Sequence, residues 1–92
     1  MSTIQPGYEI APDGTAYDYL RKPNAPVVVL IHGLGLCRHM WRDHIANFAA
    51  DYQVLSYDLV GHGNSAAPTA TTDLSLYARQ LLGLLDLSLI HI

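Results

Sequence analysis

The sequence predicts an α/β fold, in which parallel strands alternate with helices. Two short, mostly apolar segments, residues 27–31 and 54–57, have the composition of strands buried in a parallel sheet. Each runs into a glycine-containing loop and then into a segment whose apolar residues recur at helical spacing. The chain has 92 residues, of which 50% are hydrophobic and 14% charged, so it forms one small domain or part of a larger one.

Composition and charge exclude several classes of function. The net charge of −3 and the scattered positions of the five Lys and Arg residues argue against nucleic-acid binding. The N-terminus shows no signal peptide, and no apolar stretch reaches the ~20 residues that span a bilayer. The single cysteine, Cys37, fits a reducing compartment. We therefore expect a soluble cytoplasmic protein without membrane contacts.

The N-terminal segment, residues 8–22, is predicted to form a β-hairpin. Pro12-Asp13-Gly14 supplies the turn, and larger side chains alternate with small or charged ones on the second arm. Residues 23–26 then break the chain with two prolines. The first buried strand follows directly, from Val27 to Ile31.

One helix is predicted between the two buried strands, from about Arg38 to Ala50. Apolar residues recur there at helical spacing, namely Met40, Trp41, Ile45, Phe48 and Ala49. The second buried strand, Val54 to Tyr57, follows with Asp58 at its C-terminal end. Strand, helix and strand together make a βαβ unit.

A second helix is predicted over residues 74–86. Thr71 or Thr72 is the expected N-cap, and Asp73 falls in the first turn, where the helix dipole favours an acid. The predicted apolar face consists of Leu74, Tyr77, Ala78, Leu81, Leu82 and Leu85.

The last six residues, LSLIHI, continue this helix poorly. They match one reading frame of the mosaic-end adaptor used in transposase-based sequencing libraries. We predict that residues 87–92 are an adaptor-derived tail, and the alternative is a genuine short strand.

The first motif that could carry chemistry is HGLG, residues 32–35, directly after the first buried strand. Its two glycines allow a sharp turn and a close approach of the backbone to a ligand. A dinucleotide fingerprint is excluded because Arg38 stands where the third glycine belongs, and a phosphate loop because no Gly-Lys-Ser/Thr follows. His39 and His44 lie on different faces of a helix, which argues against a metal site. We predict neither a metal nor an organic cofactor.

The second motif, DLVGHGNS, spans residues 58–65 after the second buried strand. It lies at the C-terminal edge of the sheet, where α/β proteins place their sites. It is not a nucleophile elbow, G-x-S-x-G, because Gly63 occupies the central position and Ser65 comes two residues later. We interpret Asp58 as a carboxylate that accepts N–H groups of the 61–65 turn, rather than as a catalytic acid.

The two histidines of these motifs receive different interpretations. We interpret His32 as a structural hydrogen-bonding residue rather than a general base. His62 either lines a substrate pocket or tolerates an unusual backbone angle. The residues predicted to shape the two loops are thus His32, Gly33, Gly35, Asp58, Gly61, Gly63 and Ser65.

Together, the two motifs resemble the start of an α/β-hydrolase fold protein of the esterase and lactonase-like branch. The shared features are a buried strand ending in HGLG, a Trp soon afterwards, and a second strand ending in D-x-x-G-H-G-x-S. The resemblance covers about residues 8–86 and implies that 1–86 are the N-terminal portion of an α/β-hydrolase domain. It also implies that the backbone N–H of Leu34 is one of two oxyanion-hole donors.

The resemblance further implies that the nucleophile, the acid and the catalytic histidine follow later in such a chain. No residue of this sequence then fills those roles, and the chain alone is expected to be inactive. The whole protein that contains this chain is expected to be a serine-type hydrolase acting on a small carboxylic ester or lactone. The alternatives are a non-catalytic ligand-binding or receptor protein on the same fold, and a relative of epoxide hydrolases or haloperoxidases.

Overall fold

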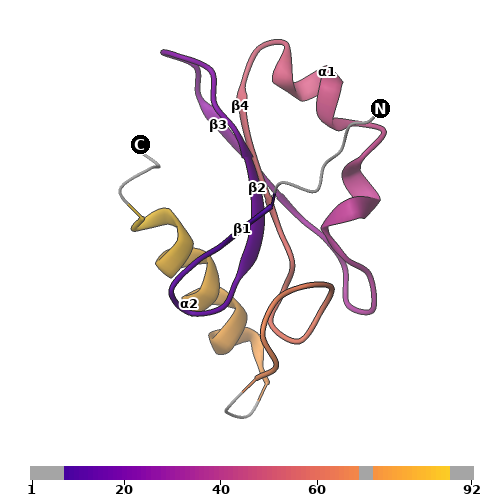
Figure 1. Ribbon diagram of the computed structural model, residues 1–92, viewed down its shortest axis with the longest axis vertical. Helices are drawn as coiled ribbons and strands as arrows, with labels where there is room; N and C mark the ends of the chain where they lie inside the picture. Colours follow the sequence, from indigo (N-terminus) through magenta and orange to yellow (C-terminus); the bar gives the residue numbers. More distant parts are fainter. Residues whose placement is uncertain (1–7, 69–71, 88–92) are drawn as a thin grey trace.

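A four-stranded mixed sheet forms the middle layer of the computed structural model, which describes residues 8–68 and 72–87 (Figure 1). The strands lie in the order β1-β2-β4-β3. β3 and β4 are parallel, whereas β2 pairs antiparallel with both β1 and β4. The bounds are β1 (Glu9–Ile10), β2 (Ala16–Leu20), β3 (Val27–Ile31) and β4 (Gln53–Tyr57). The predicted α/β fold, the N-terminal hairpin and the parallel strand pair are confirmed.

The hairpin turn forms where the sequence predicts it. The N–H of Ala11 donates to the carbonyl of Thr15 and the N–H of Gly14 donates to the carbonyl of Ala11, both at 2.8 Å. The carboxylate of Asp13 accepts the N–H of Thr15 at 2.9 Å, which is the local bond that Asp offers in turns.

Alternate residues of the central strands face opposite layers. The register places Tyr17 beside Tyr57 and Tyr19 beside Leu55. These side chains form the main core with Leu84 of α2 (Leu74–Leu85). The intervening residues point to the other side of the sheet, where η1 (Arg38–Trp41) and α1 (Ile45–Ala49) lie (Figure 1).

The single helix predicted from Arg38 to Ala50 is wrong. Two short helices, η1 and α1, stand in its place and are joined by a turn. The backbone bonds at this turn run from Arg42 N–H to the His39 carbonyl and from His44 N–H to the Trp41 carbonyl. Such three-residue steps are the tighter 3₁₀ winding, which apolar spacing does not distinguish from an α-helix over a short segment.

The second helix begins at the predicted residue, but its cap differs. Asp73, not a threonine, is the N-cap, because its carboxylate accepts the Leu76 N–H at 3.0 Å. Thr72 makes no such bond among the described residues, and Thr71 lies outside them.

The apolar face predicted for α2 is only partly right. Tyr77, Leu81 and Leu85 pack against the core, but the predicted Leu74, Ala78 and Leu82 are exposed. The buried residues of the helix are instead Gln80 and Leu84. Because almost every turn of this helix carries leucine, apolar periodicity does not single out one face.

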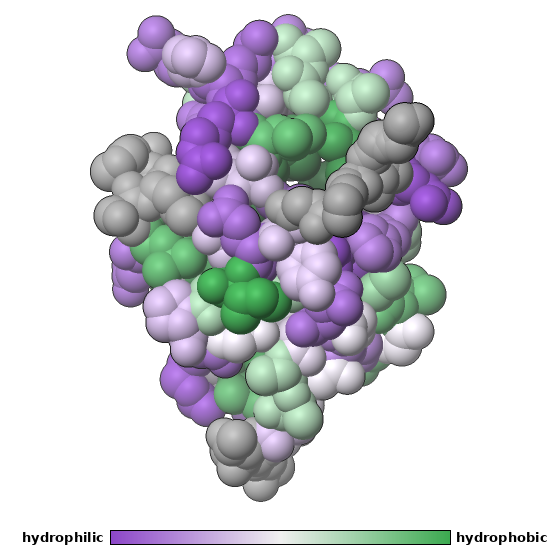
Figure 2. Space-filling model, in the orientation of Figure 1, coloured by the Kyte–Doolittle hydropathy of each residue, from purple (hydrophilic) through white to green (hydrophobic). Residues whose placement is uncertain are grey.

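Several large apolar side chains remain exposed. Four lie around the end of β3 and the beginning of η1, and Figure 2 shows apolar patches interspersed with polar residues over one face of the molecule. Within the described residues, β3 is hydrogen-bonded to a neighbouring strand along one edge only. The four are Ile31, Leu34, Leu36 and Met40.

No helix in the described part of the chain has the length and apolarity that crossing a bilayer requires. Residues 88–92 of the predicted adaptor-derived tail lie outside that part. The assignment of residues 1–86 and 87–92 to domain and tail stays a prediction.

Candidate functional site

The two predicted loops meet at one edge of the sheet. β3 and β4 are parallel, and their final residues, Ile31 and Tyr57, are register partners. The segments that follow them, residues 32–37 (the first loop) and residues 58–65 (the second loop), therefore emerge side by side (Figure 1).

His32 joins the two loops from a buried position. Its Nε2 accepts the N–H of Leu59 at 2.9 Å, so the proton of the neutral ring is on Nδ1. Nδ1 lies 2.7 Å from the carbonyl oxygen of Gly33 and donates to it. Because both ring nitrogens are engaged, His32 has no free nitrogen with which to act as a general base.

His62 makes a second connection between the loops. Its Nε2 accepts the N–H of Gly35 at 3.0 Å, and its Nδ1 lies 3.0 Å from the Val60 carbonyl. The ring centres of His32 and His62 are 5.2 Å apart. The left-handed backbone angles of the second loop fall on its two glycines and not on His62, so the unusual-angle interpretation of His62 is wrong.

Asp58 is a fully buried acceptor at the base of the second loop. Its Oδ1 accepts the N–H of Arg38 at 2.6 Å, and its Oδ2 accepts the N–H of Asn64 at 2.9 Å. Burial alone would raise the pKa of Asp58, but these two N–H groups and the Arg38 guanidinium hold the pKa below its ordinary value. Asp58 is therefore an anion that orders backbone.

Arg38 supplies the counter-charge, with only 3% of its side chain exposed. Its Nη1 lies 2.5 Å from Asp58 Oδ2 and its Nε lies 2.8 Å from Asp18 Oδ2. Nη1 also donates to Asn64 Oδ1 at 3.1 Å, and the guanidinium carbon lies 4.6 Å from the centre of the Tyr8 ring. One guanidinium thus joins β2, the beginning of η1 and the second loop.

Gly63 and Ser65 complete the packing around Asp58. Gly63 has a φ of +49°, and a Cβ there would overlap the Asp58 carboxylate, so a side chain is excluded. The hydroxyl of Ser65 donates to the Asp58 carbonyl at 2.6 Å and accepts the N–H of Ala16 at 2.9 Å. The second loop is therefore attached to β2 as well as to β4.

Leu34 lies on the exposed part of the first loop, with 71% of its surface accessible. The N–H groups of Gly35, Leu36 and Arg38 are all donated within the protein. Among the described residues, none accepts the N–H of Leu34, nor those of Gly33 and Cys37. Within the described part of the chain, no group competes with a bound oxygen atom for the Leu34 N–H.

Gly33 differs from the other loop glycines. Its φ lies outside the left-handed region, and a Cβ there would make an ordinary contact of 3.7 Å with Leu36. Gly35, by contrast, has a φ of +82°. The described residues therefore require glycine at position 35 for the turn, but not at position 33.

Two residues of the site are absent from the set predicted from sequence. Arg38 lies 20 residues from each of its carboxylate partners, and nothing in one sequence links the three. Gln80 is buried and bonds the Asp58 carbonyl, the Val60 N–H and the Thr15 hydroxyl. Gln80 stands four residues before Leu84, the other buried residue of α2, but the apolar spacing of this leucine-rich helix does not mark that face.

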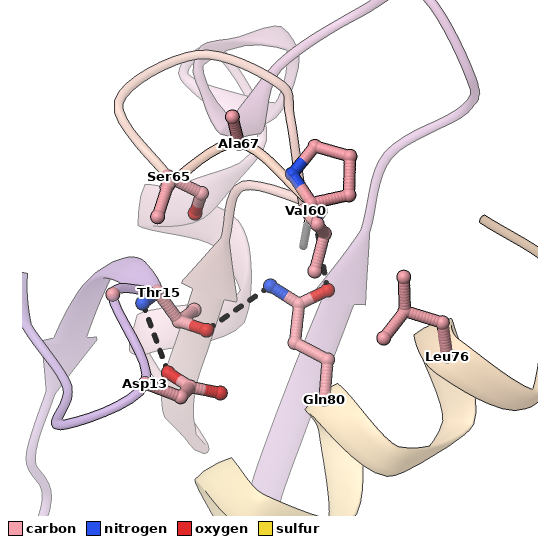
Figure 3. A pocket seen from close by; sticks show the side chains of 10 residues that line it. Asp13, Thr15, Val60, Ser65, Ala67, Leu76 and Gln80 are labelled. Carbon is pink, nitrogen blue, oxygen red and sulfur yellow. Dashed lines mark hydrogen bonds between the residues drawn. The ribbon is translucent and has the colours of Figure 1, made fainter. Parts of the chain in front are cut away.

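A pocket of about 240 Å³ lies beside the second loop, between the hairpin turn and the beginning of α2 (Figure 3). Asp13, Thr15, Ser65 and Gln80 supply its polar side chains, and each of them already makes a hydrogen bond to another of these side chains or to the backbone. No residue of the first loop lines this pocket. The described residues also hold no cluster of three or more His, Cys, Asp and Glu that could bind a metal ion.

Comparison with known proteins agrees with this architecture. A family model described as the alpha/beta hydrolase fold matches residues 26–91. Epoxide hydrolase A of Mycobacterium tuberculosis is 41% identical over 68 residues, which are 71% of this chain and 21% of that protein. 3-Oxoadipate enol-lactonase 1 of Acinetobacter baylyi is 36% identical over 63 residues, which are 68% of this chain and 23% of that protein.

Among solved structures, the enol-lactonase of Burkholderia xenovorans LB400 superposes on this chain with a TM-score of 0.74. The two are 33% identical, and the match covers 87% of this chain and 32% of that one. The chain spans about a fifth of the length of the curated relatives named above, 21% and 23%. With the family model matched over most of its residues, this chain belongs to the α/β-hydrolase fold family.

Proposed function

We propose that the whole protein, of which this chain is the N-terminal part, hydrolyses a small carboxylic ester or lactone through an acyl-enzyme. The observation that carries the proposal is the backbone N–H of the exposed residue Leu34, which has no acceptor among the described residues and lies in a loop held to its neighbour by His32, His62 and Arg38. The similarity to two enol-lactonases supports the same reaction class.

In this mechanism the Leu34 N–H donates to the oxygen that becomes negative when a nucleophile attacks the substrate carbonyl. The second donor is the N–H of the residue after the nucleophile. Donors that are fixed before the reaction need no reorientation, and losing one typically costs about 2.7–4 kcal/mol of transition-state stabilisation. The nucleophile, the acid and the catalytic histidine lie outside these 92 residues in this proposal.

The histidine, acid and serine of the two loops have other tasks. His32 uses both ring nitrogens, Asp58 binds Arg38, and the Ser65 hydroxyl both donates and accepts within the protein. In this proposal, these side chains hold the two loops in place and do not react.

Epoxide hydrolysis is the second candidate, because the relative with 41% identity is an epoxide hydrolase. An epoxide oxygen also develops negative charge as its ring opens, so the loop suits both reactions. The residue at the nucleophile elbow distinguishes them, a serine for ester hydrolysis and an aspartate for epoxide opening. A non-catalytic protein on the same fold would carry neither.

The test compares two substitutions at one position in the whole protein. Leu34→Ala keeps the backbone N–H and Leu34→Pro removes it. With p-nitrophenyl butyrate and dihydrocoumarin as substrates, we expect Leu34→Ala to retain most of kcat and Leu34→Pro to lose roughly 10²–10³-fold. Circular dichroism of both variants checks that the fold is kept.

A fluorophosphonate probe supplies an independent readout. A serine nucleophile would give one covalent adduct, detected by intact-mass spectrometry. Turnover of styrene oxide without a covalent adduct would show that the protein is an epoxide hydrolase and not a serine-type esterase or lactonase. Absence of an adduct and of turnover on all three substrates would exclude both candidates and favour the binding protein.

A further inference from the structure

We propose that Arg38 is a positioning residue that holds the first loop, and with it the Leu34 N–H, in the geometry needed for oxyanion binding. The proposal rests on the proposed function for its effect on the reaction. Its structural part, that Arg38 orders residues 33–37, stands on the contacts alone.

The contacts place Arg38 at the end of the first loop with two separate attachments to Asp58. Its backbone N–H donates to one carboxylate oxygen at 2.6 Å, and its guanidinium contacts the other at 2.5 Å. Both carboxylate oxygens of Asp58, at the base of the second loop, therefore bind Arg38, the residue directly after the first loop. The further bond to Asp18 prevents the guanidinium from turning about the Asp58 contact.

The rest of the first loop has little packing to hold it. A Cβ at Gly35 would meet nothing within 4 Å, and Leu34 and Leu36 are exposed. The attachments between the loops are polar: His32 at the beginning, the Gly35 N–H in the middle and Arg38 at the end. Because Leu34 lies between the first two and Arg38 anchors the far end, movement of Arg38 changes where the Leu34 N–H points.

Arginine is suited to this position by its shape as well as its charge. The planar guanidinium contacts Asp18, Asp58 and Asn64 through two of its nitrogens at once. A lysine would carry the same charge as a single ammonium, which cannot reproduce this fixed pattern of donors. Arg38→Lys therefore separates the positioning effect from the effect of removing a buried charge.

The experiment uses the whole protein with Arg38→Lys, and with Arg42→Lys as the control at an exposed arginine four residues later. Steady-state kinetics on p-nitrophenyl butyrate give kcat and KM, and hydrogen–deuterium exchange gives the protection of residues 33–37. We expect Arg38→Lys to lower kcat by about 10²-fold, because a misplaced catalytic group slows the reaction, while KM stays near the value of the unsubstituted protein. We also expect faster exchange at Gly35 and Leu36, and no change in either readout for Arg42→Lys.

Parental kcat together with parental exchange in Arg38→Lys would overturn the proposal. If the unmodified protein hydrolyses no ester or lactone, the proposed function fails, and exchange alone decides whether Arg38 orders the loop. Faster exchange than in Arg42→Lys supports the ordering, and equal exchange refutes it. Should Arg38→Lys fail to fold, Asp58→Asn, which keeps an oxygen for the Arg38 N–H, is expected to change both readouts in the same direction, and parental values would refute the proposal.

Discussion

Replacement of Gln80 by leucine tests how the second loop is attached to α2. The Gln80 amide donates to the Thr15 hydroxyl at 3.1 Å and to the Asp58 carbonyl at 3.0 Å, and it accepts the Val60 N–H at 3.1 Å. Leucine fills a similar volume without these groups. The Asp58 carbonyl keeps its bond from the Ser65 hydroxyl, and the Thr15 hydroxyl can rotate, so the Val60 N–H is the group that loses its partner.

The expected cost follows from that one group. A buried donor without an acceptor destabilises a protein by about 1–3 kcal/mol, while the two donated bonds vanish together with the amide that made them. Because the bond between Val60 and Gln80 is only partly buried, we expect Gln80→Leu to lower the free energy of unfolding of the whole protein by about 1 kcal/mol, at the lower end of that range. Gln80→Glu should cost more at neutral pH, because an ionised carboxylate would face the Asp58 carbonyl, and it should recover stability on acidification.

Urea unfolding followed by Trp41 fluorescence measures these differences. Arg79→Leu is the matched control, since Arg79 is exposed on the same helix, and its effect should stay within about 0.5 kcal/mol. A Gln80→Leu protein as stable as the control would refute the reasoning, because the Val60 N–H would then have no need of the amide.

Three further predictions concern the loops and the sheet edge. Because folding lowers the pKa of Asp58, the ionised carboxylate stabilises the folded protein above pH 3.8, the ordinary pKa, and this stabilisation is lost as the pH falls below that value. The urea midpoint should therefore fall as the pH is lowered through this range, and Asp58→Asn should reduce that dependence on pH. Gly63→Ala should destabilise the whole protein by more than about 1 kcal/mol in the same assay, since φ is +49° and the methyl group would overlap Asp58. Purified residues 1–92 should show no cooperative calorimetric transition, because β3 presents an apolar edge unpaired within the described residues; a sharp transition would contradict this.

The sequence was sufficient for the strands but not for the helix between them. Val27 to Ile31 is apolar throughout, which predicted a strand, and the parallel partner follows from the length of the connection. The expected burial is only partly met, because β3 lies at the edge of the sheet within the described residues and Ile31 is exposed. The segment from Arg38 to Ala50 carries the same apolar spacing whether it winds as one α-helix or as η1 and α1. Arg38, the first residue of η1, is bound to Asp58, and a contact between residues 20 positions apart is not visible in the apolar spacing of the segment.

Some residues of the candidate site could likewise be predicted from the sequence, and others could not. Motif spacing placed Leu34 and Asp58 at one edge of the sheet, because loops after parallel strands must meet there. It could not pair Arg38 with Asp18 and Asp58, since β2 and η1 are brought together only by the antiparallel pairing of β2 with β4. Gln80 was also out of reach of sequence reasoning, because the leucines around α2 do not single out the face on which Gln80 and Leu84 are buried.

The polar character of this network has a physical explanation in the task proposed for the first loop. A loop that presents N–H groups to a substrate cannot be covered by apolar packing, because the covering atoms would occupy the substrate's place. The position of the first loop must then be determined on its protein-facing side, by hydrogen bonds to the second loop. Burying Arg38 with Asp58 is costly in desolvation, and a well-packed apolar pair at the same place could be equally stable. An apolar pair would offer no acceptor to the Arg38 and Asn64 N–H groups, so the two loops would lose the bonds that align them. The ion pair also stabilises the folded state above pH 3.8. In the role proposed for the first loop, orientation is the contribution that an apolar pair could not replace.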